Sequence, residues 1–173
     1  MSRSLLAVAA ALSFLSVPTL SAAETPAHRP TPAAPYLFKS SASLADLEKT
    51  LQGAGAHPAE LVKPGPTAMQ VVWAHEEEQV QNGVEVHEGR DHVFFVTDGK
   101  ATFILGGTLE GGKEVSPGEW RAPRSTGSQT IDARKGDLIV IPHGTVHSRS
   151  TKGSKFTMLQ ISFWPGGAPP ATK

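Results

Sequence analysis

From Thr67 to Phe163, short runs rich in Val, Ile, Phe and Thr alternate with turns that contain glycine. Eight strands are predicted in this region: Met69–Ala74, Gly83–His87, Val93–Thr97, Ala101–Leu105, Gln129–Ala133, Asp137–Ile141, Val146–Ser150 and Phe156–Phe163. Strands this short and closely spaced, with a single helix beside them, favour an antiparallel sandwich or barrel. The pattern therefore predicts an all-β domain.

The sequence predicts some of the turns between these strands more clearly than others. Asp98-Gly99 is the strongest turn signal, because a two-residue type I′ hairpin needs positive φ at both central residues. It predicts a hairpin between the third and fourth strands. The segment from Glu110 to Ser128 is longer and more polar, and it is predicted to be a loop that could act as a lid over the barrel.

The chain before the barrel divides into three parts. Residues 1–23 read as a signal peptide and residues 24–40 as a linker rich in proline and alanine. Residues 41–66 are predicted to hold one helix and a connection, with the helix capped by Ser43, carrying a stripe of leucines and ending near Gly53. The barrel is assigned to residues 67–164 and a C-terminal tail to residues 165–173.

The signal peptide assignment rests on the order of its parts. Arg3 is followed by an apolar run from Leu5 to Leu15, and Ser21-Ala22-Ala23 supplies small residues for cleavage after Ala23. The apolar run is about eleven residues long, whereas a transmembrane helix needs about 20, so a retained membrane anchor is the weaker interpretation. We expect a periplasmic or secreted protein.

The composition limits the classes of binding partner that we expect. Sixteen basic residues balance sixteen acidic residues, which argues against nucleic acid or an anionic membrane as a partner and favours a small molecule. The chain has no cysteine, so neither a lipid anchor on a cysteine nor a disulfide framework is expected.

Four polar residues fall at positions suited to metal binding. Glu85 and His87 are two residues apart on a predicted strand, so their side chains point to the same face. His92 opens the next strand after a short turn, and His147 follows much later. Imidazole and carboxylate groups are good ligands for divalent transition metals, and they would be costly to bury in a barrel without a partner.

The spacing of these residues resembles the two motifs of the cupin superfamily. The second motif has a glycine, five residues, Pro-x-Gly, two residues and a histidine, and Gly136, Pro142, Gly144 and His147 fit this spacing. The first motif usually reads His-x-His, then glutamate, then glycine. Here it is permuted to Glu85-x-His87-x4-His92, and Gly99 fits the final glycine.

The resemblance covers about Thr67 to Phe163. The chain looks most like small exported bacterial cupins of one domain. This resemblance implies a double-stranded β-helix, or jelly-roll barrel, that holds one divalent transition metal (Fe, Mn, Ni or Zn). The ligands implied are Glu85, His87, His92 and His147, with Glu85 as either a ligand or a catalytic general base. The resemblance also implies a homodimer.

Three functions remain open at this stage. The favoured one is an enzyme of the dioxygenase, isomerase or lyase type acting on a small oxygenated molecule. A closed, four-coordinate site would instead serve metal handling or structure, because closed sites do not catalyse. A barrel that binds a ligand without catalysis, or whose polar lining holds no metal, is also compatible with the sequence.

The roles of four other residues also remain open. Gln160 could face the metal or satisfy a neighbour, and Arg121 and Arg124 could bind a carboxylate substrate or lie in solvent. His75 is expected to be solvated or hydrogen-bonded.

Overall fold

The structure is a computed structural model that describes residues 36–53, 57–65 and 67–167. The predicted signal peptide, its cleavage site at Ala23 and residues 24–35 of the linker lie outside the described residues, as do residues 168–173. All described residues belong to one compact unit. Among them, no helix is both long enough and apolar enough to cross a membrane.

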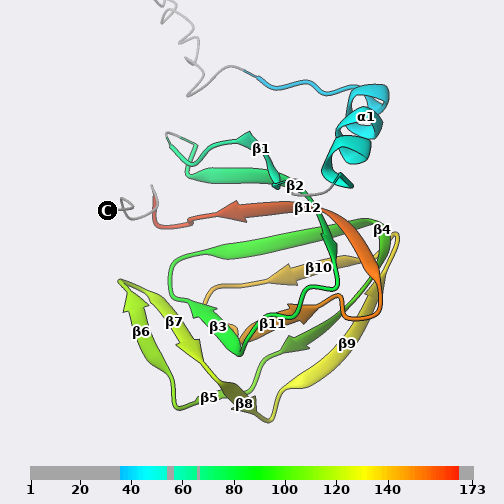
Figure 1. Cartoon of the computed structure of the whole chain (residues 1–173). Helices are drawn as coiled ribbons and strands as arrows, with labels where there is room; N and C mark the ends of the chain where they lie inside the picture. Colours follow the sequence, from blue (N-terminus) through cyan, green and yellow to red (C-terminus); the bar gives the residue numbers. More distant parts are fainter. Residues whose placement is uncertain (1–35, 54–56, 66, 168–173) are drawn as a thin grey trace, which may run out of the picture. The chain divides into compact units, whose positions relative to one another are not determined.

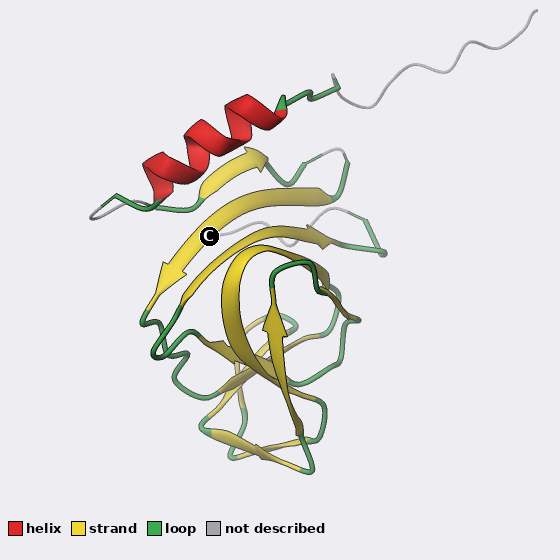
Figure 2. Cartoon of the chain, turned by 90° about the vertical axis from the view of Figure 1, so that its right-hand side faces the viewer, coloured by secondary structure: helices red, strands yellow, loops and turns green. Residues whose placement is uncertain are grey.

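The helix α1 spans Ser41–Leu51 and begins slightly earlier than predicted. The side chain of Ser40 accepts a hydrogen bond from the backbone N–H of Ser43 at 3.1 Å, so Ser40 is the capping residue and Ser43 lies inside the first turn. Either serine offers a hydroxyl to the free N–H groups of the first turn, and the sequence alone did not separate them. Leu51 is the buried residue of the helix, which lies beside β1 and β2 (Figures 1 and 2).

The described chain contains twelve strands, and seven of them correspond to the eight predicted. Their bounds are β1 Ala59–Val62, β2 Met69–Glu77, β3 Val84–His87, β4 Asp91–Leu105, β5 Thr108–Glu110, β6 Lys113–Ser116, β7 Glu119–Ala122, β8 Arg124–Thr126, β9 Gln129–Arg134, β10 Leu138–Ile141, β11 His147–Ser150 and β12 Lys155–Phe163. Eight predicted strands match seven observed ones because the predicted strands Val93–Thr97 and Ala101–Leu105 are both part of β4, and the five additional strands are β1 and β5–β8.

The long strand β4 joins the two sheets of the barrel (Figure 1). Its first half pairs with β12 and β10, in a sheet that continues through β2 to β1. Its second half pairs with β9 and β11, and β11 leads on to β3, β7 and β6. All these pairings are antiparallel, and they confirm the predicted all-β barrel.

The prediction of a hairpin at Asp98-Gly99 is wrong, because both residues lie within the continuous strand β4. The pairing with β12 skips Thr97: Met158 faces Val96, and Thr157 faces Asp98. This bulge changes which residues point inward, from His92, Phe94 and Val96 before it to Ala101 and Phe103 after it. Gly99 takes a φ of +74°. A Cβ there would lie 1.9 Å from the carbonyl oxygen of Lys155, so only glycine fits.

The predicted loop from Glu110 to Ser128 is also not a structureless lid. It contains the strands β6, β7 and β8, and β7 pairs with β3 over its whole length. In β7, Trp120 and Ala122 pack in a second core cluster, and the residues that alternate with them, Glu119 and Arg121, contact His87 and Glu85 of β3. The segment forms one wall of the barrel.

Apolar side chains fill the barrel interior beside the polar residues. Phe94, Phe103, Phe156 and Met158 are almost fully buried, and together with smaller residues they form the main core cluster. His92 lies one inward position before Phe94 on β4, with the two ring centroids 5.5 Å apart. The buried histidine His92 therefore packs directly against the apolar core.

Candidate metal centre

Three histidines from three strands meet inside the barrel. His87 ends β3, His92 lies at the start of β4 and His147 opens β11. Their ring centroids are 5.0–5.5 Å apart, and all three residues are buried. One ring nitrogen of each can be chosen so that all three lie within 4.8 Å of one another. The structure thus brings together the three histidines selected from the sequence.

Each imidazole is held through its Nδ1 atom. Nδ1 of His87 contacts Glu119 Oε2 at 2.5 Å, Nδ1 of His92 contacts the Ser162 hydroxyl at 2.8 Å, and Nδ1 of His147 contacts the Thr145 carbonyl oxygen at 2.9 Å. A carbonyl can only accept, so Nδ1 of His147 carries the proton and its Nε2 has a free lone pair. That Nε2 is buried and has no hydrogen-bond partner within the described chain.

Burial keeps these imidazoles uncharged. Desolvation lowers the pKa of His87 and of His147 from 6.5 to about 4, and that of His92 to about 2. Nearby arginines lower the three pKa values further, since a positive charge disfavours an imidazolium. Neutral imidazole is the form that binds metal, so the site is prepared for a cation.

Glu85 lies beside the histidines, on β3, where the pairing register places it between two neighbours. His147 of β11 faces it on one side and Arg121 of β7 on the other. Its Oε1 lies 3.2 Å from Nε2 of His147 and 3.7 Å from Nε2 of His87, while Oε2 forms an ion pair with Arg121. One carboxylate oxygen therefore faces the histidines and the other faces an arginine.

These donors fit a divalent transition metal. The orphaned Nε2 of His147 and the mutual approach of the three rings offer three nitrogen ligands, and Oε1 of Glu85 offers an oxygen within reach. Zn, Fe, Ni and Mn accept such a mixed set. The hydrogen bonds to Nδ1 supply the outer support that metal-bound histidines usually have.

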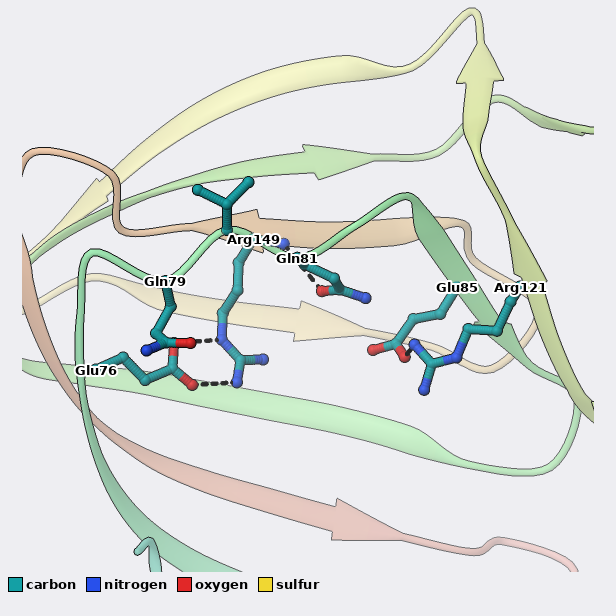
Figure 3. Close-up of a pocket in the computed structure, with 7 residues that line it drawn as sticks. Glu76, Gln79, Gln81, Glu85, Arg121 and Arg149 are labelled. Carbon is teal, nitrogen blue, oxygen red and sulfur yellow. Dashed lines mark hydrogen bonds and ion pairs between the residues drawn. The ribbon is translucent and has the colours of Figure 1, made fainter. Parts of the chain in front are cut away.

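Three arginine–glutamate pairs surround the histidines. Arg90 pairs with Glu119 at 2.8 Å on the side of His87, and its Nη2 also lies 2.7 Å from Nδ1 of that ring. The other two pairs, Arg121–Glu85 and Arg149–Glu76, line a pocket of about 290 Å³ together with Gln79, Val80 and Gln81 (Figure 3). Glu85 belongs both to this pocket and to the surroundings of the histidines.

The turn of the second motif holds His147 in place. Gly144 takes a φ of +76°, and its N–H donates to the carbonyl of His87 at 2.7 Å, which ties this turn to the end of β3. The glycine and proline spacing of the motif thus has a direct structural reason. This turn, the three clustered histidines and the antiparallel double sheet together identify the fold. The chain has the cupin fold.

The chain is similar to several solved structures. The Bacillus halodurans protein BH2720 matches with a TM-score of 0.51 and 18% identity, over 80% of this chain and 86% of that one. A conserved protein with a double-stranded β-helix domain from Klebsiella pneumoniae matches with a TM-score of 0.47 and 15% identity, over 81% of this chain and 100% of that one. A cupin superfamily protein from Desulfitobacterium hafniense matches with a TM-score of 0.43 and 18% identity, over 62% and 76% of the two chains. No family model and no curated protein matches the sequence.

Several residues around the histidines were missed by sequence reasoning. Glu119 lies opposite His87 because β7 pairs with β3, but its segment was predicted to be a loop. Ser162 lies opposite His92 in the pairing of β12 with β4. Arg149 is two residues after His147 on the same strand, and this spacing is the one signal that could have pointed to it.

Gln160, His75 and Arg124, whose roles the sequence left open, take outer positions, and so does His143. Gln160 donates to the Ser162 hydroxyl at 3.2 Å, so it satisfies a neighbour and lies one contact away from His92. His75 contacts Thr157 and Glu77, as expected for a hydrogen-bonded residue. His143 contacts Asp91 at 2.6 Å and is exposed, and Arg124 is exposed in an ion pair with Glu110. None of these four side chains is among the three clustered histidines or the pocket lining.

Proposed function

We propose that this cupin binds one divalent transition metal (Fe, Mn, Ni or Zn) through His87, His92 and His147, and that it is an enzyme acting on a small oxygenated molecule. The observation that carries the proposal is the buried cluster of three neutral imidazoles with the orphaned Nε2 of His147. Leaving this buried nitrogen unpartnered would cost about 1–3 kcal/mol, so a ligand is expected there.

The chain's own residues divide the work between binding and proton transfer. The bound ion would supply a Lewis acid or redox centre of the kind used by dioxygenases, isomerases and lyases. Glu119, Ser162 and the Thr145 carbonyl keep the three rings oriented. Glu85 lies between the histidines and the pocket, so its carboxylate can either complete the ligand set or take a proton from a molecule in the pocket.

The second candidate is a metal-handling or small-ligand-binding protein without catalysis. Oε1 of Glu85 lies within 4 Å of Nε2 of both His87 and His147. Three histidines and this carboxylate could therefore close around a zinc ion as a tetrahedron, which leaves no position for a substrate.

Elemental analysis and X-ray absorption of the purified protein decide between these functions. About one equivalent of iron, manganese or nickel in five- or six-coordination supports the enzyme. Four-coordinate zinc without an exchangeable water supports metal handling or a structural role. The absence of any metal, also after incubation with each ion, would rule out both metal-dependent functions.

A pair of histidine variants tests the location of the site. His147→Ala should lose most of the bound metal, because it removes a buried ligand. His143→Ala is the matched control, since this neighbouring histidine is exposed and pairs with Asp91. Equal metal content in the two variants would contradict the proposed ligands.

Glu85→Gln separates the two roles of Glu85. As a general base, Glu85 would be needed for turnover far more than for metal binding, so activity should fall much further than metal content. Parallel losses of metal and activity would make it a ligand instead.

We also propose that the protein is exported, on the basis of residues 1–23. Mass spectrometry of the protein from a periplasmic or secreted fraction should find a mature chain beginning at Glu24. A chain that keeps residues 1–23 and stays in the cytoplasmic fraction would contradict export.

A further inference from the structure

We infer that the pocket beside the histidines binds small aliphatic carboxylates, which Arg121 and Arg149 recognise. This inference rests on the proposed metal function and names its substrate class. It is carried by the chemistry of the pocket lining, by the donors that the lining leaves free, and by the charge balance around the site (Figure 3).

The pocket lining is almost entirely polar. Val80 is its single apolar side chain among the described residues, and the other six are Glu76, Gln79, Gln81, Glu85, Arg121 and Arg149. No aromatic ring is among them, so the pocket offers no stacking surface for a flat aromatic compound. Its volume of about 290 Å³ is at the lower end for ligand sites, which suits a small ligand.

The lining offers more free donors than free acceptors. Arg149 uses Nε and Nη2 on Glu76, at 2.9 and 2.5 Å, and its Nη1 has no partner in the described part of the chain. Arg121 contacts Glu85 through Nη1, which leaves Nε and Nη2. The amide oxygen of Gln81 accepts from the backbone N–H of Arg149 at 3.3 Å, so its NH₂ group is left for a ligand. Such a pocket suits a ligand rich in acceptor oxygens.

The charges in the site favour an anion once a metal is bound. Each of the three arginines has a glutamate partner, so these pairs are neutral in sum. The three histidines are uncharged as well. A divalent ion then leaves the site with a net charge of about +2. A guanidinium binds a carboxylate through parallel hydrogen bonds, so carboxylates complement this site better than neutral polyols do.

The geometry also explains how one ligand could contact the arginines and the metal position at the same time. Glu85 contributes Oε1 toward the histidines and Oε2 toward Arg121, so Arg121 lies directly beside the metal position. Arg149 lies on the opposite part of the pocket, with its guanidinium 5.5 Å from the centre of the Phe94 ring. Carboxylates with additional hydroxyl or carboxyl oxygens could contact the arginines and the metal position together.

Calorimetric titration of the metal-loaded protein tests this inference. The probes are malonate and D-gluconate, each compared with its neutral counterpart, malonamide or D-glucose. We expect at least one of the two carboxylates to bind at least tenfold tighter than its counterpart. Arg149→Gln and Arg121→Gln should each weaken that binding about tenfold or more, because each removes a charged donor. Arg124→Gln is the matched control, since Arg124 lies outside the pocket.

Measuring the metal content of every sample distinguishes a failure of the proposed function from a failure of the proposed substrate class. If the wild-type protein takes up no metal, the proposed function fails, and this inference fails with it. If the metal is present but neither carboxylate binds, or neither exceeds its neutral counterpart, the substrate class alone is wrong. Unchanged carboxylate affinity in both pocket variants at full metal content would show binding by the metal alone and would overturn the role of the arginines.

Discussion

The histidine cluster and the pocket beside it share Glu85 but handle charge in opposite ways. In the cluster, all three imidazoles are buried and uncharged, and each Nδ1 contacts a polar neighbour, with Arg90 as a second neighbour of the His87 ring. In the pocket, the charged groups remain charged and are paired, and their side chains are partly exposed. The three imidazoles carry no charge, so a bound metal would supply the positive charge of the cluster. In the pocket, the charges of two arginines are already balanced by two glutamates.

This difference has a physical cause. A buried imidazole avoids the desolvation cost of ionisation by losing its proton, which an arginine cannot do at any ordinary pH. The arginines therefore need carboxylates beside them, and the histidines do not. Substitutions in the cluster should change metal binding and the pH dependence of stability, while substitutions in the pocket should change mainly ligand binding.

The largest expected effect is a loss of stability of the metal-free protein in mild acid. Histidines in the unfolded chain take up protons below about pH 6.5, but in the folded protein the three pKa values are about 4, 2 and 4. The unfolded state then binds more protons, so the free energy of unfolding falls as the pH drops from 6.5 toward 4. Between pH 7 and 5.5 the fall should be on the order of 3 kcal/mol in denaturant titrations.

His87→Gln should remove about a third of this pH dependence, and His143→Ala should leave it unchanged. Equal stability of the wild-type protein at pH 7 and 5.5 would mean that the cluster is not buried in its neutral form.

Metal removal should have the next largest effect. A ligand at 100 times its Kd stabilises the folded state by about 2.7 kcal/mol. For a domain of this size, that corresponds to a decrease in Tm of roughly 5–10 °C after treatment with a chelator. The comparison is made by thermal unfolding with and without chelator, using His147→Ala as the control. A similar shift in that variant would place the metal elsewhere.

Ser162→Ala should have a smaller effect on metal binding. It removes the hydroxyl that holds Nδ1 of His92, so the ring loses orientation, and metal affinity should fall about 10- to 100-fold. Competition with a metal indicator measures the change. Gln160→Ala should lower the affinity less, because Gln160 contacts Ser162 and not the ring. If the two variants were equally impaired, the hydroxyl would not be the group that orients His92.

The smallest effect is expected for Glu76→Gln in the pocket. This variant weakens the ion pair with Arg149, whose side chains are 16% and 23% exposed, and it should cost about 1 kcal/mol or less in chemical denaturation. Metal content and the pH dependence of stability should stay as in the wild-type protein. A change in either would show that pocket and cluster are not independent.

The sequence alone determined the barrel and the position of the three histidines. The runs of β-branched residues predicted most strands, since such residues favour a pleated and half-buried surface. The spacing of Gly136, Pro142 and Gly144, which resembles the second cupin motif, pointed to His147, and the positive φ of both glycines gives that spacing its local reason. Local patterns and the motif resemblance were enough for these features.

Tertiary structure alone decided the surroundings of the histidines. Glu119 reaches His87, and Ser162 reaches His92, through pairings between strands that lie 32 and 70 residues apart in the chain. The bulge in β4 also depends on its neighbour, since the carbonyl of Lys155 occupies the space of a side chain at Gly99. The sequence at Asp98-Gly99 fits a hairpin and a bulge equally well, because both need a residue with positive φ. Only the register of β12 against β4 selects the bulge, and that register depends on contacts distant in sequence.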